Sequence, residues 1–264
     1  MTEVAALLFD VDGTLVDTEE IHRQAFNQAF LTFGLGWEWA PDLYADLLAV
    51  SGGVERMAAH IDRLDTTSTE KTRLRQLVPS VHREKTRIYG ELLSSSAARL
   101  RPGVERLIKD AQRAGIKVGL AATSAAANVQ SLVAAAFGPD SRRIVTAIVC
   151  VDWVARKKPA PDVYELLLST LRVHERAAVA FEDSANGVAA AKAAGLVTVA
   201  TPSRWTRGQD LRAADLILPS LGDPHDPLPP LLAARLGGVP YLGLAQVESL
   251  LHSRGPAASR AAAT

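Results

Sequence analysis

The sequence predicts an α/β protein: a Rossmann-like, doubly wound parallel sheet core with an inserted small α-helical cap domain. Three observations lead to this fold class. Residues 4–9 form an apolar run without polar alternation, which is typical of a strand buried on both faces of a parallel sheet. Residues 17–91 then show helical periodicity and no convincing strand. From Pro102 onward, helical segments alternate with short apolar runs, as expected of a parallel sheet.

The inserted helices are indicated by the spacing of their apolar residues. Asp17 and Thr18 are candidate N-caps, and the apolar residues that follow recur at helical spacing until Gly34. Further helices are expected over residues 41–50, 53–64 and 69–90.

The alternating part of the chain predicts five more strands with helices between them. The strands are expected over 116–121, 144–149, 178–181, 197–200 and 215–218, and the helices over 103–114, 126–136, 161–170 and 184–195. We therefore expect a core of residues 1–16 and 92–225 and a cap of residues 17–91. A C-terminal extension, 226–264, begins with a proline-rich connector and should pack on the core, with about its last ten residues frayed.

Composition excludes several classes of protein. The 264 residues carry 29 Lys and Arg against 29 Asp and Glu, a balance that predicts no nucleic-acid partner and no anionic membrane surface. The single cysteine, Cys150, rules out an intramolecular disulfide and fits a reducing compartment. No apolar stretch is long enough to span a bilayer, and the first strand begins too early to leave room for a signal peptide. We expect a cytoplasmic monomer.

Two carboxylates, Asp10 and Asp12, stand where the first strand should end. Open α/β sheets bind ligands at the carboxyl ends of their strands. Two such acids repel each other and are costly to desolvate, so they imply a cation or a compensating substrate, and Mg²⁺ prefers oxygen ligands. Asp10 would then be a metal ligand and nucleophile, and Asp12 a general acid and base. The simpler alternative is a turn with two solvated aspartates.

Polar residues follow the other strands as well, and the ends of parallel strands share one rim. Thr123 or Ser124 would bind a phosphoryl group through a hydroxyl and backbone N–H groups. Lys158 would place a positive charge beside it, and Glu182 with Asp183 would complete the metal shell. Singly these residues could be helix caps, solvated lysines or a capping turn. Their occurrence at one rim favours a site.

The segments DVDGT, TS, KKPAPD and EDS, in that order, resemble the four motifs of the haloacid-dehalogenase superfamily of aspartyl-phosphate phosphatases. The resemblance covers nearly all of residues 1–220, and the helical insert resembles the superfamily's small cap. It implies that Asp10 is phosphorylated and that Asp12 protonates the leaving oxygen and then activates water, with Thr123 and Lys158 completing the catalytic set. It also implies that Mg²⁺ lies between Asp10, the Asp12 carbonyl and Asp183.

A narrower resemblance is to the CbbY branch, which dephosphorylates xylulose 1,5-bisphosphate, an inhibitor of Rubisco. Residues 17–26, 34–39 and 51–56 carry it. It implies a set of substrate-binding residues: Glu19, His22, Gly52, Gly53, Arg56, Ser124 and Lys158. Arg56 would meet the distal phosphate, and Glu20 could take the place of Glu19.

One departure from the branch pattern concerns Val54, because the branch usually reads GGKER. If that lysine pairs with a phosphate, Arg56 is left to compensate with Lys85 or Arg23. A shifted substrate preference and weaker binding of the same substrate both remain open.

We therefore expect a Mg²⁺-dependent phosphatase of small phosphorylated sugars that works through a phospho-aspartate, with xylulose 1,5-bisphosphate as the expected substrate. The alternatives are a mutase similar to β-phosphoglucomutase, a phosphoglycolate phosphatase, and an inactive sugar-phosphate-binding protein.

Overall fold

A computed structural model describes residues 3–96, 99–138 and 141–253. Its centre is a six-stranded sheet in the order β3-β2-β1-β4-β5-β6, with every neighbouring pair parallel. The strands are β1 (Ala6–Phe9), β2 (Lys117–Ala122), β3 (Ala147–Cys150), β4 (Ala178–Glu182), β5 (Val197–Ala200) and β6 (Leu216–Ile217). The order extends from β1 in both directions, so the sheet is doubly wound and the predicted fold class is confirmed.

The first strand lies at the middle of the sheet because each of its side chains is apolar and fully buried. Leu7 and Phe9 face one side, where they share a core with α5 and α11. Ala6 and Leu8 face the other side and pack with α8 and α9. Phe9 stacks on Phe181 of β4 with ring centroids 4.4 Å apart, which fixes the register at the end of the strand that carries Asp10.

Helices cover both faces of the sheet. Those of the core are α5 (Val104–Arg113), α6 (Ala126–Phe137), α7 (Ser141–Ile144), α8 (Asp162–Leu171), α9 (Ala185–Ala193), α10 (Pro230–Arg235) and α11 (Leu244–His252). The segment after the sheet returns to the core, where Leu242 N donates to Leu221 O at 2.8 Å and Val247 of α11 is fully buried. Among the described helices, none combines the length and apolar character needed to cross a membrane.

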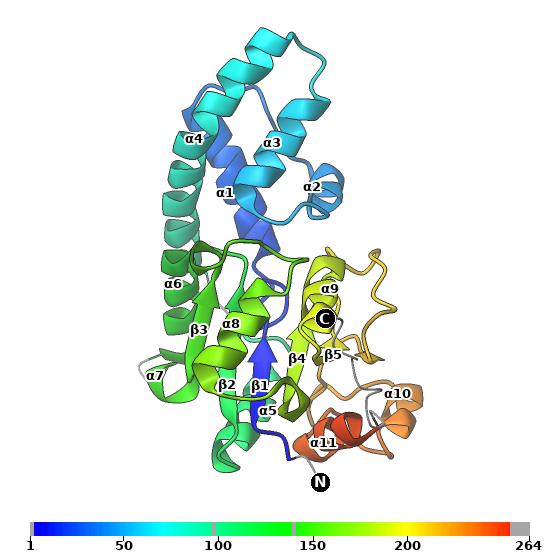
Figure 1. The fold of residues 1–264 in the computed structure, drawn as a ribbon. Helices are drawn as coiled ribbons and strands as arrows, with labels where there is room; N and C mark the ends of the chain where they lie inside the picture. Colours follow the sequence, from blue (N-terminus) through cyan, green and yellow to red (C-terminus); the bar gives the residue numbers. More distant parts are fainter. Residues whose placement is uncertain (1–2, 97–98, 139–140, 254–264) are drawn as a thin grey trace, which may run out of the picture.

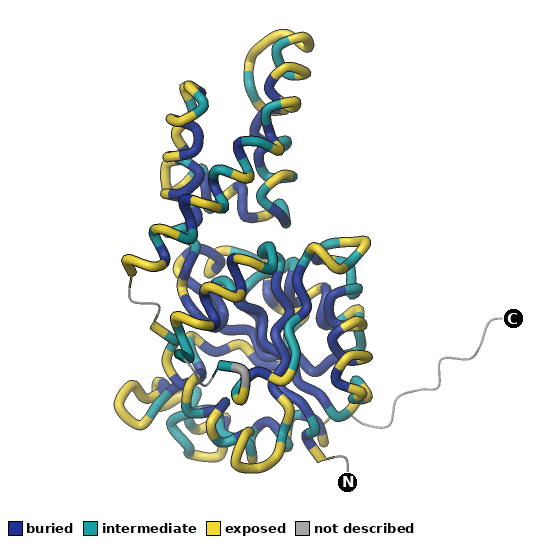
Figure 2. The backbone as a smooth tube through the Cα atoms, turned by 90° about the vertical axis from the view of Figure 1, so that its left-hand side faces the viewer, coloured by how far each residue is buried: buried dark blue, intermediate teal, exposed yellow. Residues whose placement is uncertain are grey.

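Four helices form the cap, which lies over the carboxyl ends of the strands (Figure 1). They are α1 (Glu19–Thr32), α2 (Pro41–Leu47), α3 (Gly53–Arg63) and α4 (Ser68–Ser95). An aromatic cluster joins α1 and α3 to the segment before α2: the centroid of the Trp39 ring lies 4.6 Å from that of Phe26, 4.9 Å from that of Phe30 and 5.6 Å from that of His60. Figure 2 shows the strands buried along their length, whereas the cap helices alternate between buried and exposed residues.

The two connections between cap and core run side by side. Val16 forms an antiparallel bridge with Leu100, and Arg101 N donates to Leu15 O at 2.8 Å. The Arg101 guanidinium donates to the carbonyls of Gly13 at 2.5 Å and Thr201 at 2.6 Å, so this point is fixed to the sheet as well.

Several boundaries differ from the prediction; helix α2, for example, ends at Leu47 and not at residue 50. The third strand begins at Ala147 and not at 144, because residues 141–144 form a helical turn closed by Val145 N donating to Ser141 O. The proline-rich connector ends in a short helix, α10, whose first residue is Pro230, a position where proline is well tolerated. Helix α4 continues to Ser95, five residues past the predicted end, and buries Leu93. The predicted frayed end, 255–264, lies outside the described residues.

Candidate active site

Lys158 connects two buried carboxylates at the carboxyl end of the sheet. Its Nζ lies 2.6 Å from Asp10 Oδ1 and 2.5 Å from Glu182 Oε1, and it donates to the carbonyl of Ala121 at 3.1 Å. Burial raises the pKa of Asp10 to about 7, and the charge of Glu182 acts in the same direction against that of Lys158. Tyr164 also donates its hydroxyl to Glu182 Oε1. This arrangement presents Asp10 at the rim with a cation beside it.

A third carboxylate, Asp183, makes the cluster strongly acidic. Oxygens of Asp10, Glu182 and Asp183 lie within 4.8 Å of one another. Burial, followed by the charges of the other two acids, holds the pKa of Asp183 well above its usual range. Glu182 Oε2 is buried and has no hydrogen-bond partner in the described part of the chain. Three buried carboxylates beside one lysine suit a hard divalent cation with oxygen ligands such as Mg²⁺.

Asp12 is surrounded by hydrogen-bond donors. Its Oδ1 accepts from Thr18 Oγ1 at 2.6 Å and lies 3.1 Å from His22 Nε2, while Oδ2 accepts from Ser124 Oγ at 2.5 Å. Burial alone would raise the pKa of Asp12, but His22 and the two hydroxyls hold it well below the usual range. The carboxylate is therefore ionised in this arrangement. Thr18 stands at the N-cap position of α1 but makes no capping bond, because its hydroxyl turns to Asp12.

Two residues of α4 contact the His22 ring on the side away from Asp12. Lys85 Nζ lies 2.7 Å from His22 Nδ1, and the Tyr89 ring stacks on the imidazole at 4.1 Å. An ammonium donor at Nδ1 leaves the ring proton on Nε2, which faces Asp12. Burial lowers the pKa of Lys85 to about 8. Helices α1 and α4 thus both contribute to the position of Asp12.

The cap and the sheet rim enclose two connected compartments. The catalytic compartment, about 50 Å³, contains Asp10, Lys158 and Asp183. The outer compartment, about 250 Å³, extends toward His82, Lys85, Asn128 and Lys157. Both are lined by the same five residues: Asp12, Glu19, Gly52, Arg56 and Thr123. The predicted residues Asp10, Asp12, Thr123, Lys158 and Asp183 are therefore brought to one cavity, and Glu182 lies buried directly behind it.

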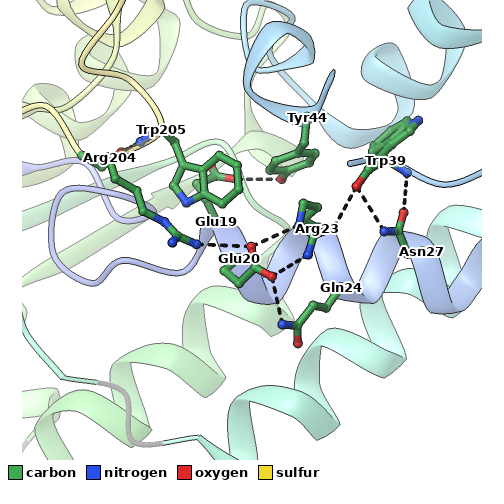
Figure 3. A network of polar contacts seen from close by, with 10 residues as sticks. Glu19, Glu20, Arg23, Gln24, Asn27, Trp39, Tyr44, Arg204 and Trp205 are labelled. Carbon is green, nitrogen blue, oxygen red and sulfur yellow. Dashed lines mark hydrogen bonds and ion pairs between the residues drawn. The ribbon is translucent and has the colours of Figure 1, made fainter. Parts of the chain in front are cut away.

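Glu19 and Glu20 point in different directions (Figure 3). Glu19 lines the cavity and accepts a hydrogen bond from Tyr44 Oη at 2.6 Å, and Tyr44 in turn accepts one from Arg56 at 3.0 Å. Glu20 pairs with Arg23 at 2.7 Å outside both compartments. Of the two glutamates, Glu19 is the one placed to contact a substrate.

Gly52 and Gly53 are required by close approach of their neighbours. A Cβ on Gly52, whose φ is +93°, would lie 2.9 Å from Lys157 Nζ, and one on Gly53 would lie 2.7 Å from His82 Nε2. Side chains at these positions would occupy part of the cavity.

The contributions of Tyr44, Asn128 and Thr18 to the site are absent from the sequence prediction, because only the packing of the cap shows where these side chains point.

A family model of haloacid dehalogenase-like hydrolases matches residues 4–195 of this chain. The chain belongs to this family. Its relatives include the protein CbbY of Rhodobacter capsulatus, 45% identical over 83% of this chain and 94% of that protein. The plasmid-encoded CbbY of Cupriavidus necator is 43% identical over 85% of this chain and 88% of its own. The resemblance to the haloacid-dehalogenase superfamily and to its CbbY branch is thus confirmed.

Solved structures agree with this placement. The crystal structure of CbbY from Rhodobacter sphaeroides in complex with phosphate is 42% identical, has a TM-score of 0.75 and covers 82% of this chain and 94% of its own. A mutant of that CbbY was crystallised in complex with xylulose-(1,5)bisphosphate and is 41% identical over the same shares of both chains, with a TM-score of 0.75. A β-phosphoglucomutase from Clostridium difficile, at 22% identity and a TM-score of 0.62, shares the fold.

Proposed function

We propose that this member of the family is a Mg²⁺-dependent sugar-phosphate phosphatase that hydrolyses xylulose 1,5-bisphosphate through a phospho-aspartate at Asp10. The observation that carries the proposal is that one rim of the sheet brings together two carboxylates with different partners. Asp10 lies against Lys158 beside two further acids, whereas Asp12 is hydrogen-bonded to Thr18 and His22 at the start of the cap. The bisphosphate is the ligand of the related CbbY structure.

In the first half-reaction an oxygen of Asp10 attacks phosphorus, and the bond from phosphorus to the sugar oxygen breaks. The sugar oxygen takes a proton from Asp12. Because the hydrogen bonds of the substrate-free site favour the ionised form of Asp12, this carboxyl must take up its proton as the substrate binds. Lys158 stabilises the nucleophile and the phosphoryl oxygens, because it is a buried cation within 2.6 Å of Asp10. A divalent cation held by Asp10, Asp183 and Glu182, and by the Asp12 carbonyl, would neutralise further charge on the phosphoryl oxygens.

In the second half-reaction water attacks phosphorus and the bond to Asp10 breaks, which releases inorganic phosphate. Asp12 takes the proton from the water and so regains its acid form. The contacts of Asp12 with Thr18, His22 and Ser124 aim the carboxylate and stabilise it as a base. The cap over the rim excludes bulk water and strengthens these electrostatic interactions.

The proposal is tested by measuring phosphate release with Mg²⁺ across a panel of phosphosugars that includes xylulose and ribulose 1,5-bisphosphates. We expect the highest kcat/KM on xylulose bisphosphate. A clear preference for a monophosphate such as phosphoglycolate would contradict the assigned substrate. Conversion of glucose 1-phosphate to glucose 6-phosphate with a bisphosphate primer would identify a mutase instead.

The role of Asp12 has its own test. Asp12→Asn should lower kcat by at least about a hundredfold, the usual contribution of general acid and base catalysis. Asp17→Asn is a matched control, since Asp17 is an exposed aspartate in the same loop, and it should leave the rate within about twofold. A protein that only binds sugar phosphates would show no turnover in either form.

A further inference from the structure

We infer that Lys157, assisted by the amide of Asn128, binds the second phosphate group of the substrate in the outer compartment. This inference rests on the proposed function, because only a bisphosphate places a second phosphate there. Lys157 belongs to the core. It would supply the positive charge that the GGKER pattern of the CbbY branch places on the cap, at the position of Val54 in this chain.

The two adjacent lysines serve opposite ends of the cavity. Lys158 lines the catalytic compartment, where Asp10 and Glu182 surround it. Lys157 lines the outer compartment, beside Gly52 and on the wall that also holds Val54. A substrate with phosphate groups at both ends of a short carbon chain could therefore meet one lysine at each end.

The other basic groups of the outer compartment differ in how far they are available to a ligand. Lys85 is bonded to His22. Arg56 donates to Tyr44 through one nitrogen, while its Nε has no hydrogen-bond partner in the described residues, so Arg56 can share the phosphate with Lys157. Burial, with the nearby charges of Lys85 and Lys157, lowers the pKa of His82 to about 4, so this ring is neutral at pH 7.

Lys157 itself can exchange its partner at little cost. Its Nζ lies 2.5 Å from Glu55 Oε1 of the cap, but the two side chains are 32% and 42% exposed. Ion pairs this exposed contribute about 0–1 kcal/mol. A phosphate dianion forms stronger charge-assisted hydrogen bonds with an ammonium group, so it should displace Glu55.

Asn128 supplies an independent indication of a ligand. It lies in the first turn of α6, is only 6% exposed, and lines the outer compartment. Among the described residues no hydrogen bond is formed by its side-chain amide, so the amide is available to a ligand that enters the compartment. A phosphate oxygen in the compartment would provide a partner for it.

The test uses calorimetric titration of xylulose 1,5-bisphosphate into the Asp10→Asn protein, which should bind without turnover. Adding Lys157→Met should raise the Kd about 10- to 100-fold, the effect of losing a charge-assisted contact, and adding Asn128→Ala should raise it by a smaller factor. With Asp10 intact, Lys157→Met should lower kcat/KM for xylulose 1,5-bisphosphate at least about tenfold more than kcat/KM for p-nitrophenyl phosphate, which has no second phosphate.

Glu55→Gln is the matched control, because it breaks the same ion pair from the other side. It should keep the Kd or lower it, since Lys157 becomes available. The inference is overturned if Glu55→Gln weakens binding as much as Lys157→Met. The ion pair would then act by holding the cap against the core, and Lys157 would not bind the phosphate. An unchanged Kd in Lys157→Met, or no binding of the bisphosphate at all, overturns it too. Binding without hydrolysis by the unmodified enzyme would instead refute the proposed function.

Discussion

Replacing Lys158 with methionine should destabilise the fold far more than the same replacement of its neighbour Lys157. Both ammonium groups lie 2.5 Å from a glutamate oxygen, so distance does not separate them. Burial does. The side chains of Lys158 and Glu182 are 2% and 0% exposed, whereas those of Lys157 and Glu55 are accessible to solvent.

The expected magnitudes follow from this contrast. Removing one partner of a buried ion pair leaves an uncompensated buried charge and costs about 3–5 kcal/mol. Lys158→Met would leave Asp10 and Glu182 both without their cation. Lys157→Met should cost less than about 1 kcal/mol. In a protein of this size the larger loss corresponds to a fall in Tm of about 6–20 °C.

Urea unfolding of both variants and of the unmodified protein, in the presence of EDTA, measures these differences. Adding Mg²⁺ should recover part of the loss in Lys158→Met, because a cation that binds only the folded carboxylates stabilises it by mass action. Equal losses in the two variants, or a Lys158→Met protein as stable as the unmodified one, would refute the argument from burial.

Three other substitutions test separate contacts. Gly187→Ala should lower the Tm, because the new Cβ would lie 1.8 Å from Glu182 Oε2, while Gly208→Ala, which meets nothing within 4 Å, should leave the Tm nearly unchanged in the same thermal scan. Tyr44→Phe removes the hydroxyl between the glutamate and the arginine of the cavity wall, and steady-state kinetics should show a KM increase of about 3- to 30-fold with little change in fold stability. Because burial lowers the pKa of Lys85 to about 8 from 10.5, the folded protein loses this proton before the unfolded chain does. Its contribution to the free energy of unfolding should therefore rise between pH 8 and 10.5, and urea titrations across that interval should show a smaller rise in Lys85→Met.

The rim of the site was accessible to prediction because it depends on topology alone. Parallel strands bring their carboxyl ends together, so Asp10, Thr123, Lys158 and Asp183 could be assigned to one place from the order of strands and helices. The strand boundary near Ala147 was less accessible, since an apolar run does not show where ladder pairing begins.

The cap side of the site depends on helix rotation, which a sequence pattern does not fix. Glu19 and Glu20 are adjacent on the first turn of α1 and differ by about 100° around the helix axis. Packing of α1 against α4 places Glu19 in the cavity and turns Glu20 outward. The contact of Lys85 with His22 spans 63 positions of sequence and arises from the same packing.

The paired connections at Val16 and Leu100 have a consequence for how this family can diversify. The chain leaves the sheet and returns to it within one β-bridge, so the sheet places no demand on the length or shape of what lies between. An insert whose ends are close together can be replaced as a unit without changing the register of the strands. Substrate range could therefore evolve by exchange of the whole cap, while the chemistry at Asp10 stays fixed in the sheet. Grafting another cap between Val16 and Leu100 is a direct way to change the substrate range of the protein.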